Sequence, residues 1–191
     1  MFHVEHPMMQ RYFVFGAVLL AALPHAFHLP LWAMAFGAAM LLIGALLGRP
    51  LPALLRLLLV AGVVAAITFQ FGRVWGRDAG SALLVLMAGL KALEVKGERD
   101  LVVMVFLGYF LVLAQLLYSQ SIPAFLYTLL AVWALTASLV SIRHPMGMPG
   151  LLLSGRLLLQ AIPLALLLFL LFPRIAGPLW GLPPDARAGV T

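Results

Sequence analysis

The residues from Tyr12 to Gly48 read YFVFGAVLLAALPHAFHLPLWAMAFGAAMLLIGALLG and include no Asp, Glu, Lys or Arg. As a single helix this stretch would be about 55 Å long, at 1.5 Å per residue. The hydrocarbon core of a bilayer is only about 30 Å thick, so the stretch is predicted to cross a membrane twice. Pro24, His25, His28 and Pro30 mark the turn. We expect helices over residues 12–27 and 31–48.

A second uncharged run, from Leu101 to Ile142, is also too long for one crossing. It breaks at Ser119-Gln120-Ser121-Ile122-Pro123, which predicts two helices, with Tyr127 as an interfacial anchor near the end of the second. Three shorter apolar runs bring the total to seven. The predicted fold is an all-α, polytopic transmembrane helical bundle, and the five helices outside the first run are expected at 54–72, 79–95, 101–118, 123–142 and 157–172.

The composition of the chain agrees with burial in lipid. Hydrophobic residues make up 64% of the 191 residues and charged residues only 9%, whereas soluble domains have about half and about a quarter. The net charge of +6 comes from Lys and Arg scattered singly between apolar runs, which is typical of cytoplasmic loops and not of a nucleic-acid-binding surface. The expected environment is therefore the lipid bilayer, with no nucleic acid as partner.

The positions of the positive charges predict the orientation. If the N-terminus is cytoplasmic, eight Lys and Arg residues lie on the cytoplasmic side and four on the opposite side. This imbalance favours a cytoplasmic N-terminus, and seven crossings then place Thr191 outside the cytoplasm. The eight are Arg11, Arg49, Arg56, Lys91, Lys96, Arg99, Arg143 and Arg156, and the four are Arg73, Arg77, Arg174 and Arg187.

The charged residues around the fourth helix are the first candidates for chemistry. Lys91 and Glu94 are three residues apart on one helical face and could form an ion pair in a cavity, as at a transport site. We favour an interfacial pair, because both lie in the last turn or so of an apolar run, from which long side chains reach the polar interface. Asp78 precedes a helix and is expected to cap it.

The histidines offer one pair, His25 and His28, in the first predicted outer turn. Two nitrogens without a nearby carboxylate make a poor metal site, so we interpret both as interfacial histidines. The sequence contains no Cys and no motif of a nucleophile, phosphate loop or metal centre. We therefore predict no catalytic residue, no cofactor-binding residue and no metal ligand in this chain.

Small residues recur four positions apart, a spacing that lets two helix backbones approach closely in lipid. The pattern favours a packed bundle without identifying which helices meet. The pairs are Gly44 and Gly48, Ala88 and Ala92, Ala134 and Ser138, and Ala137 and Ser141.

The middle and the end of the chain contain more specific sequence motifs. The middle contains GRDAG at 76–80, ALLVLM at 82–87, KALE at 91–94, Arg99-Asp100, FLGYF at 106–110, SQS at 119–121 and Leu126-Tyr127. The end contains LFPR at 171–174, GPLWGLP at 177–183 and Asp185-Ala186. With these motifs the chain resembles the N-terminal membrane domain of bacterial transglutaminase-like proteins of the TgpA type.

The resemblance implies a role for the whole chain. In that family an extracytoplasmic domain with a Cys-His-Asp set performs acyl transfer at glutamine side chains, and this sequence stops before any such domain. We therefore expect a transmembrane domain at 1–172 and an extracytoplasmic exit segment at 173–191, leading to a transglutaminase-like domain in cis or in trans.

The expected function is a non-catalytic anchor at the outer face of the bacterial cytoplasmic membrane, the inner membrane. A small transporter or the membrane subunit of one is the alternative, and a structural module that binds another membrane protein is a third class.

Overall fold

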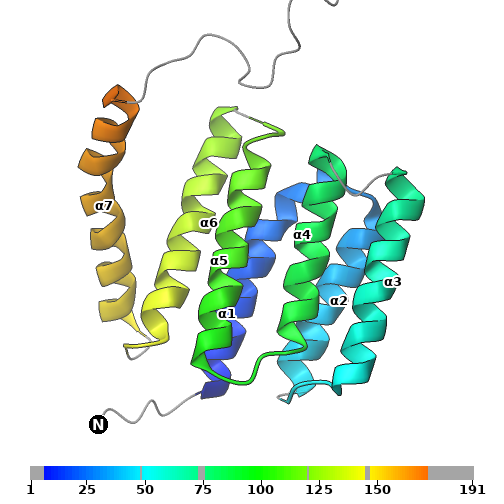
Figure 1. Cartoon of the computed structure of the whole chain (residues 1–191). Coiled ribbons are helices and arrows are strands. Elements are labelled where there is room, and N and C mark those ends of the chain that lie inside the picture. The colour runs from blue at the N-terminus through cyan, green and yellow to red at the C-terminus, as the bar shows by residue number, and fades with distance from the viewer. Residues whose placement is uncertain (1–6, 48, 73–75, 120, 145–146, 172–191) are drawn as a thin grey trace, which may run out of the picture. The chain divides into compact units, whose positions relative to one another are not determined.

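The computed structural model describes residues 7–47, 49–72, 76–119, 121–144 and 147–171. These residues form seven α-helices and one short 3-10 helix, with no β-strand among them, which confirms the predicted all-α fold (Figure 1). The elements are α1 (Pro7–Ala22), η1 (Leu23–Phe27), α2 (Leu31–Leu47), α3 (Ala53–Phe71), α4 (Arg77–Ala92), α5 (Glu98–Gln115), α6 (Ile122–Ser141) and α7 (Met148–Leu171).

Two helix boundaries were predicted wrongly. α1 begins at Pro7 and α7 at Met148, five and nine residues earlier than expected. Proline is well tolerated in the first turn of a helix, where its missing N–H has no partner to lose, so Pro149 does not delay the start of α7. Arg11 and Arg156 therefore lie within helices and not in loops.

Three helices are long and apolar enough to cross a membrane: α3, α6 and residues Met148–Leu168 of α7. α5 has 18 residues, but its first turn contains Glu98, Arg99 and Asp100. The remaining helices have 16 or 17 residues, or about 24 to 26 Å at 1.5 Å per residue. α1 is followed by the five residues of η1, which belong to the turn before α2.

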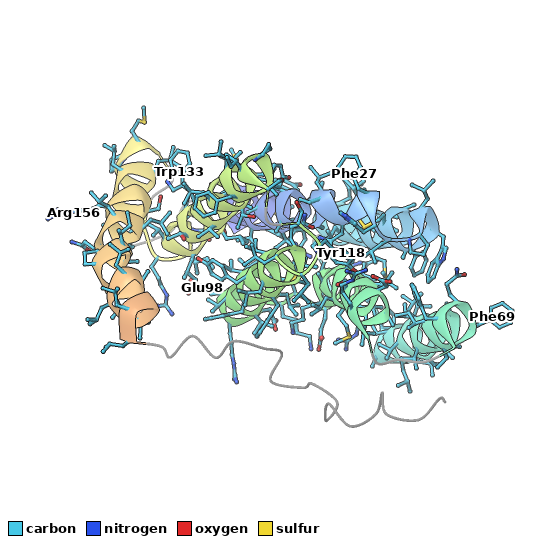
Figure 2. All side chains as sticks on the ribbon, turned by 90° about the horizontal axis from the view of Figure 1, so that it is seen from above. Phe27, Phe69, Glu98, Tyr118, Trp133 and Arg156 are labelled. Atoms are coloured by element: carbon cyan, nitrogen blue, oxygen red, sulfur yellow. The ribbon has the colours of Figure 1, made fainter. Side chains whose placement is uncertain are left out.

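Residues 1–156 form one compact unit. Its helices lie in two layers, one made of α6, α1 and α2 and the other of α5, α4 and α3 (Figures 1 and 2). Across the layers α2 packs on α4 and α1 packs on α5. α1 also contacts α2 and α6, so the first helix of the chain lies in the middle of its layer.

Close backbone approach holds α2 against α4. A Cβ atom on Gly44 would lie 2.7 Å from the carbonyl oxygen of Ala92, and one on Gly89 would lie 2.9 Å from that of Gly37. Only glycine permits this spacing. Gly44 and Ala92 were two of the small residues singled out in the sequence, and the structure identifies their helices as partners; Gly48 lies outside the described residues.

Residues 157–191 form the second unit. Its described part is the remainder of α7, an apolar helical segment that contains Pro163. The predicted exit segment at 173–191 lies outside the part of the chain that the structure describes.

Candidate functional site

Four charged side chains meet at one end of α4, and we call them the Lys91 cluster: Arg56, Lys91, Glu94 and Asp100. Lys91 Nζ lies 2.8 Å from Asp100 Oδ1 and 3.4 Å from Glu94 Oε2. Glu94 Oε1 in turn lies 2.9 Å from Arg56 Nη1. The predicted pair of Lys91 and Glu94 therefore exists, but each partner makes a shorter contact with a residue that was not expected.

The helix ends explain why these charges gather here. Lys91 lies in the last turn of α4 and Asp100 in the first turn of α5, where the helix dipoles favour a cation and an anion respectively. The second carboxylate oxygen of Asp100 accepts a hydrogen bond from the backbone N–H of Lys96 at 2.9 Å. Asp100 thus links Lys91 to the backbone of the loop between α4 and α5.

Two polar residues near the start of α1 are buried, which sequence reasoning missed. Arg11 Nη2 donates to the carbonyl oxygen of Gly44 at 2.6 Å, and Gln10 Nε2 donates to that of Ser141 at 2.8 Å. Both acceptors lie in the last turn of their helices, where carbonyl groups have no partner within the helix. Gln10 and Arg11 therefore cap α6 and α2, and Arg11 is not a loop charge as predicted.

The opposite end of α4 carries a second group, the Tyr118 cluster: His25, His28, Arg77, Asp78 and Tyr118. The Tyr118 hydroxyl donates to Asp78 Oδ1 at 2.9 Å, and burial raises the pKa of this hydroxyl, so it remains a donor. The Arg77 guanidinium lies 4.6 Å from the Tyr118 ring centroid, and the His28 ring lies 4.5 Å away. Tyr118, labelled in Figure 2, thus brings together the turn after α5, the start of α4, and η1 with the residue that follows it.

Asp78 does not cap α4 in the expected way. It is the second residue of the helix, and the N-cap is Gly76, with no hydrogen bond from a capping side chain. Its carboxylate accepts from Tyr118 and from Arg77 Nε, at 2.9 and 3.2 Å. Asp78 still complements the positive end of the helix dipole, but its hydrogen bonds join α4 to the turn after α5.

His25 is buried inside the bundle, and its predicted position at the membrane interface stays a prediction. Its side chain is fully buried in η1, its ring centroid lies 6.0 Å from that of Tyr118 in an edge-on arrangement, and burial lowers its pKa to about 4. His28 is exposed and its Nδ1 lies 3.4 Å from the Pro24 carbonyl oxygen. Among the described residues no group of three or more His, Asp or Glu could hold a metal.

Hydrogen bonds between helices occur along the bundle as well as at its ends. The half-buried Tyr127 donates to the carbonyl oxygen of Leu20 at 2.6 Å, so its hydroxyl is bonded to α1. Its predicted role as an interfacial anchor stays a prediction. Trp133 Nε1 donates to Ser154 Oγ at 3.0 Å. Such bonds hold helices together in lipid, where burial of apolar surface gives little preference for helix–helix contact.

Together the apolar helices, the interhelical hydrogen bonds and the charges at the helix ends define an all-α domain of membrane-protein character. The chain belongs to the TgpA N-terminal domain family, whose profile matches residues 13–191. The resemblance inferred from the motifs is thereby confirmed.

A curated relative supports the assignment. The chain is 43% identical over 185 residues to a protein-glutamine gamma-glutamyltransferase of Pseudomonas aeruginosa strain PAO1, a match that covers 92% of this chain and 27% of the relative. The chain thus spans about a quarter of the length of this relative. No solved structure matches the chain significantly.

Proposed function

We propose that this chain is a non-catalytic membrane domain that holds a transglutaminase-like domain at the outer face of the bacterial cytoplasmic membrane. Membership of the TgpA N-terminal domain family supports this role. So does the relative named as a glutamyltransferase, because the match covers only 27% of it and leaves most of that protein for other domains. The partners are the lipid bilayer and a transglutaminase-like domain in cis or in trans.

The composition of the chain supports a non-catalytic role. The resembled family uses a Cys-His-Asp set, and this sequence has no Cys. A thiolate is the nucleophile in that chemistry, and this sequence has no thiol to supply it. Catalysis is therefore assigned to the partner domain.

The positions of the charged side chains give the main support for the anchor proposal. In α1 to α6 the described charged side chains belong to the ends of helices or to the loops between them. A transport path usually places polar groups or broken helices near the midplane, so this arrangement favours an anchor over the transporter alternative. The excess of Lys and Arg at the Lys91 end favours a cytoplasmic location for that end.

The Tyr118 end carries exposed aromatic side chains. Phe27 and Phe69 are 89% and 94% exposed, and both side chains point away from the bundle in Figure 2. Large exposed apolar side chains such as these are suited to contact with lipid. Seven predicted crossings place the C-terminal end of the chain on the side opposite the N-terminus, where an extracytoplasmic domain would follow.

Two fusions to a reporter enzyme that is active only in the periplasm test the proposal. A fusion after Thr191 should be active, and a fusion after Lys96, in the loop of the Lys91 cluster, should be inactive. Immunoblots confirm equal amounts of both fusions. If the Lys96 fusion is active and the Thr191 fusion silent, the orientation is inverted and an outer-face anchor is excluded.

A further inference from the structure

His25 is the most deeply buried titratable side chain of the Tyr118 cluster. Its exposed fraction is 0%, no described residue forms a hydrogen bond of good geometry with either ring nitrogen, and the nearby Ala22 backbone opposes the effect of burial on the pKa only in part. An exposed imidazole near neutral pH exchanges its proton freely. A buried one without a partner for its charge strongly favours the neutral form.

The groups around His25 provide no counter-ion. α4 presents Arg77 and Asp78 to the Tyr118 cluster, and the Asp78 carboxylate is already bonded to Tyr118 and Arg77. The turn after α5 contributes Tyr118, and the turn after η1 contributes His28. α2 has no titratable side chain, and Arg11 and Tyr12 of α1 lie near the opposite end of that helix. No ion pair joins His25 to a described carboxylate.

The backbone around His25 is suited to local opening. η1 has only five residues, and 3-10 helices have poorer hydrogen-bond geometry than α-helices. The His25 carbonyl oxygen accepts from the N–H groups of His28 and Leu29 at 3.0 and 2.8 Å, so a displacement of His25 also moves this turn. Local opening of such a segment requires less free energy than unfolding of the bundle.

From this geometry we infer that His25 is an acid-sensitive lock, whose protonation releases η1 from Tyr118 and opens this end of the bundle. The inference does not depend on a transglutaminase domain. If the Tyr118 end faces outward, as proposed, the lock responds to the pH outside the cytoplasm and changes the surface next to any domain held there.

The direction of the pH dependence follows from burial. Burial places the pKa of His25 in the closed state at about 4, below the ordinary value of about 6.5 for a free imidazole. The open state, with a solvated ring, therefore binds a proton at higher pH than the closed state. The closed state is fully favoured above about pH 6.5, and this preference is lost progressively as the pH falls toward 4.

Thiol accessibility tests the lock, because the chain has no Cys of its own. Leu29→Cys introduces a probe at a position that is 5% exposed beside His25, and Phe27→Cys provides a reference that is 89% exposed. The purified chain in detergent is treated with a dipyridyl disulfide, a reagent that also reacts with thiols in acid. The ratio of the two labelling rates cancels the intrinsic effect of pH on thiol reactivity.

We expect this ratio to rise at least about threefold between about pH 7.5 and pH 4.5, as the imidazole gains its proton. His25→Phe should leave the ratio flat, whereas the matched variant His28→Phe should retain the rise. A third probe, Ala45→Cys at the other end of the bundle, where the side chain is 9% exposed, should keep a constant rate relative to the reference.

Three results would overturn the lock. The first is a flat ratio in the parent, the second is a rise that persists in His25→Phe, and the third is a parallel rise at Ala45→Cys, which would indicate global unfolding. If His25→Phe does not fold, the parent labelled with carbon-13 at histidine Cε1 provides the second measurement. Its His25 resonance should titrate below about pH 5, and a titration near 6.5 would exclude the lock.

Discussion

The hydroxyl of Tyr127 in α6 donates a hydrogen bond to the carbonyl oxygen of Leu20 in α1, at 2.6 Å. In a regular helix this carbonyl would accept the N–H of the residue four positions later, which is Pro24 and has none. A residue 107 positions away in the sequence thus satisfies the backbone group that the proline leaves without a partner. The turn that separates the first two helices therefore also fixes α6 against α1.

Replacing Tyr127 with Phe should destabilise the chain by about 1 to 2 kcal/mol, because the Leu20 carbonyl would be buried without a donor. Tyr109→Phe is the matched control. Its partner, Thr136 Oγ1, also donates to the Val132 carbonyl oxygen at 2.8 Å and so keeps one hydrogen bond. This variant should therefore lose less stability than Tyr127→Phe. Denaturant unfolding in detergent measures both. Equal losses for the two variants would contradict the role given to Tyr127.

Gly44→Ala should destabilise the bundle by about 1 to 3 kcal/mol, a typical effect of overpacking. The added Cβ would lie 2.7 Å from the backbone oxygen of Ala92, and backbone moves less readily than a side-chain tip. Gly62→Ala, on α3, is the control, because a Cβ there has no neighbour within 4 Å. It should leave stability unchanged or raise it by up to about 1 kcal/mol, through helix propensity. If Gly44→Ala leaves the stability of the bundle unchanged, α2 and α4 are not closely packed at this position.

Asp100→Ala should destabilise more than Glu94→Ala. The Asp100 carboxylate makes the shorter contact with Lys91 and also accepts from the Lys96 backbone, and its side chain is 25% exposed against 45% for Glu94. We expect Asp100→Ala to lower the free energy of unfolding by about 1 to 3 kcal/mol, typical of hydrogen bonds to charged groups. Glu94→Ala should lower it by about 0 to 1 kcal/mol, as for exposed ion pairs.

A double-mutant cycle with Lys91→Ala separates the pairwise coupling from other effects. Stronger coupling of Lys91 to Glu94 than to Asp100 would reverse this ranking.

The purified chain should not incorporate a labelled amine into a glutamine-containing protein, because it has no Cys to form an acyl intermediate. A soluble transglutaminase assayed in the same detergent is the positive control. Incorporation by this chain, above that of a heat-treated sample, would contradict the non-catalytic assignment.

The number of helices was predictable because the thickness of a bilayer limits how long one apolar run can be. The start of α7 was not, since Pro149 and Gly150 are typical of a loop and Arg156 was taken as a loop charge. A long side chain can extend from within a helix toward polar surroundings, so a single Arg does not mark where a helix begins.

The polar clusters were predictable only where both partners lie on one helix. The three-residue spacing of Lys91 and Glu94 indicates a contact, whereas the shorter contact with Asp100 crosses a loop and depends on how α4 and α5 pack. Tyr118 meets residues from two other turns, and no local spacing in the sequence indicates that meeting. Arg11 and Gln10 were missed because their partners are backbone carbonyls, which every residue has.

The capping bonds of α1 have a consequence for biosynthesis. Ser141, the partner of Gln10, is 131 residues further along the chain, and at about 5 to 20 residues per second a ribosome needs roughly 7 to 26 seconds to reach it. Throughout that interval α1 carries the Gln10 amide without its final acceptor, which apolar lipid disfavours. Gly44, the acceptor of Arg11, follows after only 33 residues. The nascent chain therefore needs a hydrated or protein-lined environment for Gln10 until α6 is made, so α1 reaches its final packing only after α6 is synthesised.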